Sequence, residues 1–535
     1  MLTPFRPPPE DYYQNNCATL LRFVLQTYGS LLVRTETETI EGFLGASNDA
    51  QRLMARLLTR KGPLFRPETF KYNEIDDPDC ALNELCRLGL LEKNPPMGAD
   101  GVLSRLTKLE LVSLVPMAAN KHSKAQLLQL ALSGRTDTQV CRLVYRAHKL
   151  VRISHEQIWQ LFLFLYFGER RQDWSAFVLR DLGQTRYEAL VLTPRFKDRE
   201  ALLQALEYLS LSDLSHRVSE GEKLTRDLLQ ILEPLPIDRW LARRRNKAIL
   251  RIARHHERQA DYEEALYSFS LVDVHPARER RVRILTKLGL TEAAKKLVSE
   301  IAQVPWSEEE LQFVERFGKR NAGYQPPINK YVISQWLDSR DTEASIEQQA
   351  GEILIRSGRA HWVIHAENTL VRTLTGLLYW PIVFAPVQGV FTNPFQAAPN
   401  DLYQGDFYAA RKESILEHEV RLESDTDLID VLTKTASEKF GIANDLVSWN
   451  LLKQVSLEEL LEYMPVADIR RLAKFMIRNL SERRSGLPDL FAACRDGSYE
   501  LIEVKGPGDQ LQPGQRVWLR HLKELDIPAS VMRLQ

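Results

Sequence analysis

Cysteine is scarce in this 535-residue sequence, and its few copies are scattered. No two of the five cysteines have C-x-x-C spacing, and none lies near a matching pair of histidines. We therefore expect neither a disulfide framework nor a structural zinc site, and a reducing cytosol is the compartment that fits best. The five are Cys17, Cys80, Cys86, Cys141 and Cys494.

The sequence also lacks an excess of either charge and any long apolar run. Lys plus Arg and Asp plus Glu both number 71, so net charge does not indicate a nucleic-acid partner, although a large binder can gather its basic residues on one surface. Two glycines and two prolines interrupt the longest apolar stretch, residues 374–390, and the N-terminus has no signal-peptide run. We expect a soluble cytoplasmic protein, nucleoid-associated in a bacterium.

The chain is too long for one hydrophobic core, and its apolar residues recur mostly at helical spacing. We expect a multidomain, mostly α protein that ends in an α/β domain. Residues 1–100 are predicted to form a helical domain. Its closing segment, LGLLEK before Pro95 and Pro96, resembles the end of a winged-helix unit, and a generic helical cap is the alternative.

Residues 101–140 contain two short amphipathic helices joined by a basic linker. The second helix is expected to begin after Ser123, which serves as its N-cap. This arrangement resembles a SAP-type DNA-binding unit, although any helical hairpin would show a similar pattern. On the DNA-binding interpretation, Lys121 and Lys124 contact the DNA backbone.

Residues 141–320 are helical by period and contain two similar blocks, at residues 259–269 and 288–297. Each block places small residues where a second helix must pack closely. This pattern is typical of tetratricopeptide-like helical hairpins, and the two blocks form a degenerate repeat. We expect a helical scaffold in this region.

The densest basic stretch of the chain, residues 239–258, includes a single acidic residue, Glu257. Several basic side chains fall on neighbouring positions of one helix, where like charges repel by roughly 0.2–0.5 kcal/mol per pair. Phosphate contacts would offset that repulsion through counterion release. The alternative is a solvated face with acidic neighbours from another helix. The predicted DNA contacts in this stretch are Arg243, Lys247, Arg251 and Arg254.

A linker rich in Gly and Pro precedes a C-terminal domain of residues 328–535. Near its end, Asp496-Gly497 is a hairpin turn signal between two predicted strands. Side-chain alternation on the second strand puts Glu503 and Lys505 on one face. A strict two-residue loop would turn Asp489 to the opposite face, whereas a bulge or a longer loop would bring it to the same face.

Two carboxylates at the end of a sheet, followed by a lysine, are suited to phosphodiester hydrolysis. Mg²⁺ and Mn²⁺ prefer oxygen ligands, and a metal so held binds the scissile phosphate and lowers the pKa of a water. Lys505 is then placed to orient or help deprotonate the attacking water. The alternative is an ordinary hairpin with a surface Asp489 and a Glu503–Lys505 pair, because such short matches are common by chance.

The motif Pro488-Asp489, thirteen residues and Glu503-Val504-Lys505, followed by Gly-Pro-x-Asp, closely resembles the VRR-NUC branch of the PD-(D/E)xK nucleases. A second block, residues 365–384, looks like the segment that supplies an upstream Glu ligand in Fanconi-associated nucleases, and residues 393–402 match the same family. The chain therefore resembles a bacterial-type member of that family. The likeness is clear over residues 360–535 and looser upstream.

The resemblance implies a role for each matching residue. Glu367, Asp489 and Glu503 would be metal ligands, with the backbone carbonyl of Val504 as a further one. Lys505 would be the catalytic lysine. For Glu367 the alternative is a carboxylate that interacts with the dipole at a helix N-terminus.

The resemblance also implies a 5′-flap endonuclease and 5′-to-3′ exonuclease that needs Mg²⁺ or Mn²⁺ and acts on branched DNA in interstrand crosslink repair. The branched or flapped duplex would contact the SAP-like, helical and nuclease domains. Gln515 and Trp518 are expected to have positioning and packing roles. Arg483 and Arg484, just before the motif, are candidates for DNA backbone contact.

Two departures from the family pattern are visible. The cysteine spacing excludes the ubiquitin-binding zinc finger of eukaryotic members, and residues 508–514 have none of the basic residues with which some members receive a 5′ phosphate. A strict need for a phosphorylated end is therefore not expected. The alternatives to a flap nuclease are a junction resolvase of the same superfamily and a non-catalytic DNA-binding helical scaffold. The long helical region favours a monomer that shapes its own substrate path.

Overall fold

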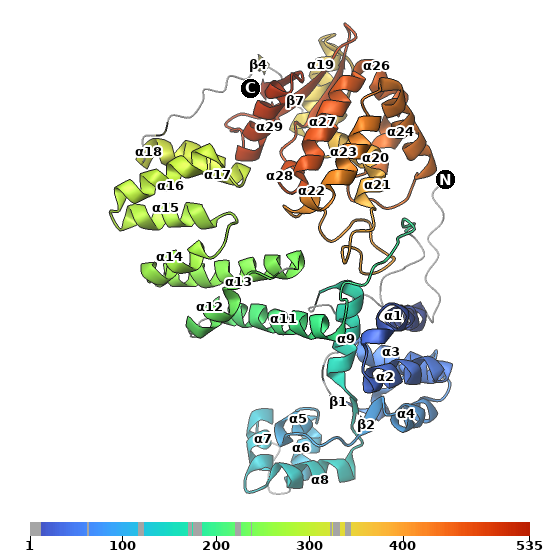
Figure 1. Cartoon of the computed structure of the whole chain (residues 1–535). Coiled ribbons are helices and arrows are strands. Elements are labelled where there is room, and N and C mark those ends of the chain that lie inside the picture. The colour runs from blue at the N-terminus through green and yellow to red at the C-terminus, as the bar shows by residue number, and fades with distance from the viewer. Residues whose placement is uncertain are drawn as a thin grey trace. The chain divides into compact units, whose positions relative to one another are not determined.

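The computed structural model describes residues 12–60, 62, 64–115, 122–169, 174, 185–219, 226–236, 238–321, 324, 332–336 and 344–535. Contacts divide the chain into two compact units (Figure 1). The N-terminal unit comprises residues 1–185 and 192–199, and the C-terminal unit comprises residues 186–191 and 200–535. Within the described ranges, no helix has both the length and the apolar character needed to cross a membrane.

The N-terminal unit begins with a group of helices that pack through apolar faces. On α1 (Tyr12–Tyr28), Leu20, Leu21, Val24 and Tyr28 are buried, as their helical spacing predicts. The other helices of this group are α2 (Arg34–Gly45), α3 (Asn48–Leu58), α4 (Pro78–Arg87) and α9 (Glu156–Phe167).

A three-stranded antiparallel sheet closes this unit, with strand order β1-β3-β2. The strands are β1 (Leu64–Phe65), β2 (Leu91–Lys93) and β3 (Val151–Ile153). Because β3 is the central strand, the chain must return to this sheet after residue 147. The boundary expected near residue 140 therefore differs from the structure, in which β3 and α9 belong to the N-terminal unit.

Four short helices are inserted between β2 and β3. Ser123 caps the third of them by accepting a hydrogen bond from the Gln126 N–H, as the sequence predicts. Leu111, Leu127 and Val144 form part of a core that these helices share. The four are α5 (Ala99–Leu103), α6 (Lys108–Leu114), α7 (Lys124–Leu132) and α8 (Asp137–Ala147).

The helical scaffold of the C-terminal unit consists of antiparallel pairs. The predicted blocks are α14 (Tyr262–Ser270), which packs on α13 (Arg239–Arg258), and α16 (Thr291–Gln303), which packs on α15 (Ala277–Lys287). The basic stretch is thus a single helix with the predicted bounds. The remaining scaffold elements are α11 (Arg199–Ser219), α12 (Arg226–Leu232), α17 (Glu308–Phe313), a π-helical turn (Val314–Gly318) and α18 (Lys319–Asn321).

The nuclease-like part of the C-terminal unit is built on a five-stranded sheet of order β4-β8-β7-β6-β5. Strands β4 (Ile333–Trp336), β8 (Ala529–Leu534) and β7 (Tyr499–Lys505) are parallel neighbours, whereas β6 (Leu490–Cys494) is antiparallel to β7 and to β5 (Ala360–His365). The connections explain why the sheet contains both parallel and antiparallel pairs. A hairpin makes β6 and β7 antiparallel, whereas the crossover through α29 (Pro513–Glu524) makes β7 and β8 parallel.

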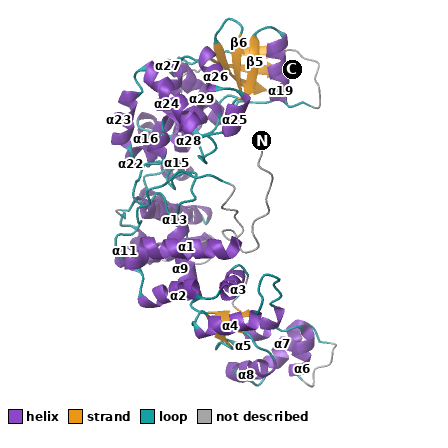
Figure 2. Cartoon of the chain, turned by 90° about the vertical axis from the view of Figure 1, so that its right-hand side faces the viewer, coloured by secondary structure: helices purple, strands orange, loops and turns teal. Residues whose placement is uncertain are grey.

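Helices cover both faces of this sheet (Figure 2). Ala350 and Leu354 of α19 (Ile346–Arg356) pack on Ile502 and Val504, which point to one face. Leu501 points to the other face, where the larger core lies. The helices on that side include α20 (Leu370–Leu378), α24 (Asp425–Glu438), α27 (Val466–Arg478) and α29. Shorter helices complete the domain: α21 (Trp380–Val383), α22 (Phe407–Ala410), α23 (Lys412–Arg421), α25 (Trp449–Gln454), α26 (Leu457–Tyr463) and α28 (Leu480–Arg483).

A glycine in α20 permits the closest packing of this core. A Cβ on Gly376 would lie 2.7 Å from Val447 Cγ2 and 2.8 Å from Leu446 Cβ. We predict that Gly376→Ala lowers the free energy of unfolding by about 1–3 kcal/mol through overpacking, as measured by thermal unfolding. Gly405→Ala is the control, because a Cβ there meets no atom within 4 Å. Equal stability of the two variants would contradict the prediction.

Candidate active site

The β6–β7 hairpin determines that Asp489 and Glu503 share a face. Leu490 lies opposite Ile502, and the same register places Asp489 opposite Glu503. The Cys494 N–H donates to the Ser498 carbonyl at 2.8 Å, and Gly497 adopts φ +83° in a three-residue loop. The structure therefore has the longer loop of the two alternatives, and both carboxylates point to the side of the larger core.

Asp489 joins the ends of three strands. Its carbonyl oxygen accepts hydrogen bonds from the N–H groups of Ala366 and Glu367, at 2.8 and 3.1 Å, just beyond the end of β5. Its carboxylate Oδ2 accepts a hydrogen bond of 2.7 Å from the Val504 N–H on β7. Glu367, Asp489 and Glu503 are consequently held at the same end of the sheet.

Glu367 lies on an exposed turn between β5 and α20. Asn368 follows with φ +52°, and its side chain donates to Glu367 Oε1 at 3.0 Å. The Asn368 Oδ1 also accepts a hydrogen bond of 3.3 Å from the Leu487 N–H, just before the Pro-Asp motif. Because α20 has no acidic residue in its first turn, a helix-dipole role does not explain Glu367.

Glu503 is the most deeply buried of the three carboxylates, with 0% exposure. Lys505 Nζ lies 2.7 Å from its Oε1, yet neither carboxylate oxygen accepts a well-directed hydrogen bond within the described part of the chain. Burial, reinforced by the negative charge of Asp489, raises the pKa of Glu503 to about 7. Burial also raises the pKa of Asp489, although the Val504 N–H and Lys505 oppose the shift.

The sequence pattern did not indicate a fourth carboxylate, Glu347. It lies in the first turn of α19, and its charge contributes to the raised pKa of Asp489. The Ser345 and Gln348 capping box marks where α19 begins but not which side chain faces the site. Only the tertiary arrangement brings Glu347 close to Asp489.

These carboxylates match the donor chemistry of a hard divalent cation. Glu503 supplies two buried oxygens without directed donors, and Asp489 and Glu367 supply further oxygens at the same end of the sheet. In the described residues, no three His, Cys, Asp or Glu groups are already arranged as a metal cage. Lys505 pairs with Glu503 and Asn368 with Glu367, so these contacts would have to adjust for a metal to bind.

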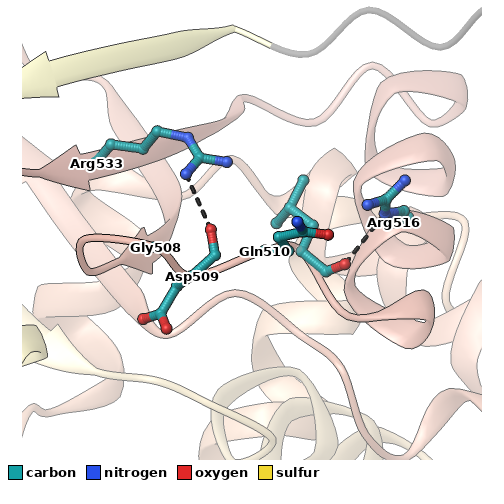
Figure 3. Close-up of a pocket in the computed structure, with 6 residues that line it drawn as sticks. Gly508, Asp509, Gln510, Arg516 and Arg533 are labelled. Atoms are coloured by element: carbon teal, nitrogen blue, oxygen red, sulfur yellow. Dashed lines mark hydrogen bonds between the residues drawn. The ribbon is translucent and has the colours of Figure 1, made fainter.

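The loop after Lys505 borders a pocket of about 430 Å³ (Figure 3). Arg533, opposite Lys505 on β8, donates to the Asp509 carbonyl at 3.0 Å. Arg516 of α29 donates to the Leu511 carbonyl at 3.1 Å. Residues 508–514 contain no basic residue, as noted from the sequence, but the fold brings two arginines to them. The composition of the loop alone therefore does not argue against phosphate recognition.

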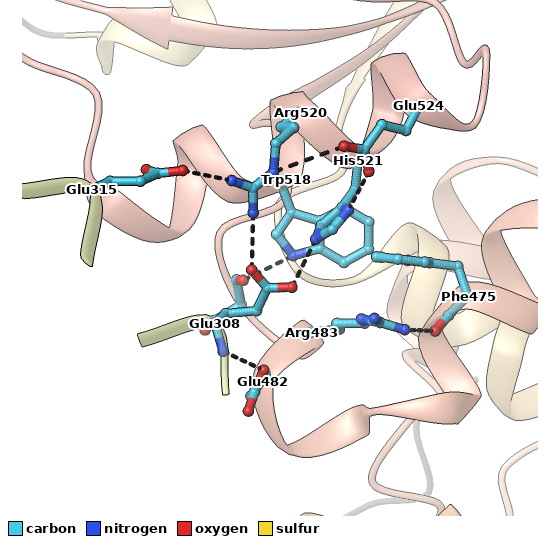
Figure 4. A network of polar contacts seen from close by, with 10 residues as sticks. Glu308, Glu315, Phe475, Glu482, Arg483, Trp518, Arg520, His521 and Glu524 are labelled. Carbon is cyan, nitrogen blue, oxygen red and sulfur yellow. Dashed lines mark hydrogen bonds and ion pairs between the residues drawn. The ribbon is translucent and has the colours of Figure 1, made fainter. Parts of the chain in front are cut away.

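Helix α29 connects the nuclease-like part to the helical scaffold through a polar network (Figure 4). The Glu308 carboxylate of α17 accepts hydrogen bonds from Arg520 at 2.9 Å and, through its other oxygen, is paired with His521 at 3.0 Å. Arg520 also pairs with Glu315 at 3.2 Å. The Glu308 N–H donates to Glu482 at 3.0 Å. The scaffold and α29 are thus joined by charged side chains from several elements.

Two contacts hold the start of α29 beside the Pro-Asp motif, and a third caps the helix itself. The Trp518 indole N–H donates to the Ser485 carbonyl at 3.0 Å, and Gln515 accepts a hydrogen bond from the Gln512 N–H at 2.8 Å. Gly486, with φ +89°, approaches Gly514 so closely that a Cβ would lie 2.9 Å from its carbonyl carbon. Trp518 and Gln515 therefore have the contacts expected of packing and positioning residues.

Two family models match the sequence. The model described as FAN1, HTH domain covers residues 11–92, and the VRR-NUC domain model covers residues 424–535. A Fanconi-associated nuclease 1 homolog of Pseudomonas aeruginosa is 31% identical, over 98% of this chain and 96% of its own length. The chain belongs to the Fanconi-associated nuclease family.

Further relatives show the same family likeness. A Fanconi-associated nuclease 1 homolog of Arabidopsis thaliana is 26% identical over 99% of this chain and 67% of its own length. A crystal structure of paFAN1 bound to 2nt 5′flap DNA with gap has a TM-score of 0.79 and 30% identity, and 99% of each chain is covered. The predicted family is confirmed, as is the mostly helical fold with a C-terminal VRR-NUC domain.

Family membership establishes the general activity. The chain is a structure-specific DNA nuclease, and DNA is its partner. Nucleases of the PD-(D/E)xK type depend on a divalent metal ion, which agrees with the donor chemistry of the three carboxylates.

Several of the arginines predicted to contact DNA have partners inside the nuclease itself, among them Arg243 and Arg483. Arg243 Nη1 lies 2.7 Å from both carboxylate oxygens of Asp406, an acidic neighbour from another part of the C-terminal unit. Arg483 donates to the Phe475 carbonyl, and its guanidinium lies 3.6 Å from the ring centroid of Phe475. Both contacts stabilise the fold, and the predicted DNA contacts of these two residues stay predictions. The Asp406 partner of Arg243 is distant in sequence, and spacing could not reveal it.

The other predicted DNA contacts differ in exposure. Arg251 is half-buried and donates to the Ser215 hydroxyl at 3.4 Å. Arg484 is exposed, with its guanidinium 4.7 Å from the ring centroid of Tyr403. Lys121 falls outside the described residues. The remaining exposed candidates are Lys124, Lys247 and Arg254.

Metal binding by this nuclease should be visible as a thermal shift. We expect Mn²⁺ to raise the unfolding midpoint of the native protein, because a ligand at 100 times its Kd stabilises the folded state by about 2.7 kcal/mol. Glu503→Gln should lose most of the shift. Glu500→Gln is the matched control, since Glu500 points to the opposite face of β7 and pairs with Arg359. An undiminished shift in the Glu503→Gln protein would place the metal elsewhere.

Proposed function

We propose that this chain is a 5′-flap endonuclease and 5′-to-3′ exonuclease that uses Mg²⁺ or Mn²⁺ and acts in interstrand crosslink repair. The observation that supports this most is the convergence of Asp489 and Glu503 on one face of the sheet, with Lys505 beside them. The flap substrate is supported by the likeness to paFAN1, which has been crystallised with 5′-flap DNA.

The proposed mechanism assigns a role to each residue at the end of the sheet. Glu367, Asp489 and Glu503, with the carbonyl of Val504, would hold the divalent ion. When bound, the ion lowers the pKa of a water and stabilises charge on the phosphate. Lys505 Nζ, 2.7 Å from Glu503 Oε1, is placed to orient the attacking water or to offset negative charge on the phosphate.

The hydrogen bond from the Val504 N–H keeps the Asp489 carboxylate directed toward Glu503. This contact fixes one carboxylate before any substrate arrives, so the ligand set does not have to be assembled during the reaction. Preorganised groups of this kind avoid the cost of reorganisation in the transition state.

The DNA backbone is proposed to contact basic residues of both units. The protein is proposed to act as a monomer, because the helical scaffold and the nuclease domain occur in one chain and share the charged network at α29. The residues proposed for phosphate contact are Lys121, Lys124, Arg243, Lys247, Arg251, Arg254, Arg483 and Arg484.

Asp489→Ala should abolish metal-dependent cleavage. With a labelled 5′-flap duplex, we expect the native protein to cut near the branch with Mn²⁺ and not with EDTA. The variant should be at least about 100-fold slower, because loss of one preorganised electrostatic group costs that much. Asp526→Asn is the control: Asp526 is exposed with φ +55°, a conformation that asparagine tolerates.

Other results of that assay would favour the alternatives. Equal DNA binding without metal-dependent cleavage by either protein would indicate a non-catalytic scaffold. Preferential cutting of a four-way junction over the flap would indicate a resolvase.

The basic helix α13 should contribute to DNA affinity through phosphate contacts. We predict that Lys247→Gln combined with Arg254→Gln weakens binding and lowers the slope of log K against log salt by about 0.9 for each lost contact. The measurement is fluorescence anisotropy over a salt series. Lys412→Gln with Lys434→Gln is the charge-matched control, and an equal change of slope in that protein would contradict the assignment.

A further inference from the structure

A second pocket lies in the N-terminal unit, between α8 and residues 94–97. Its volume is about 480 Å³, within the range of small-molecule sites. The α8 side is formed by Cys141, Arg142, Tyr145 and Arg146, which lie on adjacent turns, and the other side includes Met97. None of these residues belongs to the carboxylate site or to the predicted DNA contacts.

Hydrogen bonds hold the walls of this pocket in place. The Tyr145 hydroxyl donates to the Pro95 carbonyl at 2.6 Å, and the Cys141 thiol donates to the Met97 carbonyl at 3.3 Å. Asn94 adopts φ +49° and exchanges two hydrogen bonds with Leu150, at 2.8 and 3.2 Å. The residue 94–97 segment is therefore fastened to α8 and to the start of β3, so the pocket is formed before a ligand arrives.

The Tyr145 ring is a fixed surface in this pocket. Burial raises the pKa of Tyr145 to about 12, so the hydroxyl retains the proton that it donates to Pro95. With its hydroxyl engaged, the residue offers its ring rather than a polar group to a ligand.

Arg142 and Arg146 stand one helical turn apart on the exposed side of the pocket. Among the described residues, neither side chain forms an ion pair or a hydrogen bond. The acidic residue of the same helix, Asp137, lies at its first turn and faces Gly98. Two like charges so close together repel, and an anionic ligand would relieve that repulsion.

A rigid aromatic and apolar wall beside two free guanidinium groups matches the chemistry of a nucleotide. Bases stack on aromatic side chains, and arginine binds phosphate through paired hydrogen bonds. We propose that this pocket holds one unpaired nucleotide of a DNA strand, with the base against Tyr145 and Met97 and phosphates at Arg142 and Arg146. The inference rests on the proposed function for its choice of DNA as the ligand.

An unpaired nucleotide fits this pocket better than a paired one. In a duplex, base faces are covered by stacking, and an exposed face is available only where a nucleotide leaves the stack. A flap or gap substrate contains such nucleotides, whereas a simple nicked duplex does not.

The test compares two DNA ligands with the full-length protein in EDTA. One is a gapped 5′-flap duplex with 2-aminopurine at successive unpaired positions, and the other is a nicked duplex of the same length. Arg142→Gln with Arg146→Gln is expected to weaken flap binding at least fivefold, to change nicked-duplex binding less than twofold, and to abolish one position-specific 2-aminopurine signal. Tyr145→Leu should lose the same signal, and Tyr145→Phe, which keeps the ring, should retain it.

Arg87→Gln with Lys149→Gln removes two exposed charges from the same unit and should leave both affinities within twofold. Equal weakening toward both DNA ligands by the Arg142 and Arg146 variant would overturn the proposal and indicate general charge attraction. Unchanged binding would overturn it as well. Arg-dependent binding of free 2-aminopurine deoxynucleoside monophosphate, with unchanged flap binding, would also overturn it in favour of a free nucleotide.

Cleavage by the native protein with Mn²⁺ is measured separately, so the two proposals fail independently. If the variant loses the preference for flap DNA and the native protein does not cleave, the pocket proposal is supported and the flap-nuclease proposal is overturned. Normal cleavage by the native protein, with no effect of the variant on binding, would support the flap nuclease and overturn the pocket proposal.

Discussion

The chemistry of this protein depends on how Asp489 is held. Its carbonyl accepts the N–H groups of Ala366 and Glu367, and its carboxylate accepts the N–H of Val504. One residue thereby ties the end of β5 and the end of β7 to the start of β6, which places three carboxylates from separate segments at one end of the sheet. The register of the β6–β7 hairpin keeps Asp489 beside Glu503, because a shift by one residue would send Asp489 to the opposite face, and the pairing of β5 with β6 brings Glu367 to them.

Burial of the Glu503 carboxylate at the end of the sheet has an electrostatic cost. Glu503 has no exposed surface, and its charge is countered mainly by Lys505, while Asp489, Glu367 and Glu347 add negative charge nearby. Such an arrangement is poor for stability and suited to a cation, since buried like charges shift the pKa values upward until a positive partner offsets them. Helix α29, which follows the site in sequence, contacts the scaffold through Arg520 and His521. The scaffold and the site are thus connected by direct side-chain contacts within the C-terminal unit.

The local elements could be predicted from the sequence, because each depends on neighbouring residues. The bounds of α13, the cap at Ser123 and the alternation of Glu503 and Lys505 all follow from helical or strand period. The family resemblance added Glu367, whose position beside Asp489 depends on pairing between distant strands.

Period and spacing could not reveal partners that come from elsewhere in the chain. The Asp406 partner of Arg243, the Arg533 side chain beside the loop after Lys505 and the approach of Glu347 to Asp489 are all of this kind. The same limitation explains the domain boundary near residue 140, since no local pattern shows that β3 returns to a sheet begun at residue 64.

The insertion of α5–α8 between β2 and β3 has a consequence for the order in which the protein is made. The inserted helices share a core of their own, whereas the sheet lacks its central strand until residue 153 has been synthesised. During translation, β2 therefore waits without its partner strand while residues 94–150 are added, roughly three to eleven seconds at common synthesis rates, and β1 waits longer. Apolar residues of the surrounding helices remain uncovered for that interval, and the nascent chain is correspondingly expected to need protection from association early in synthesis rather than at its end.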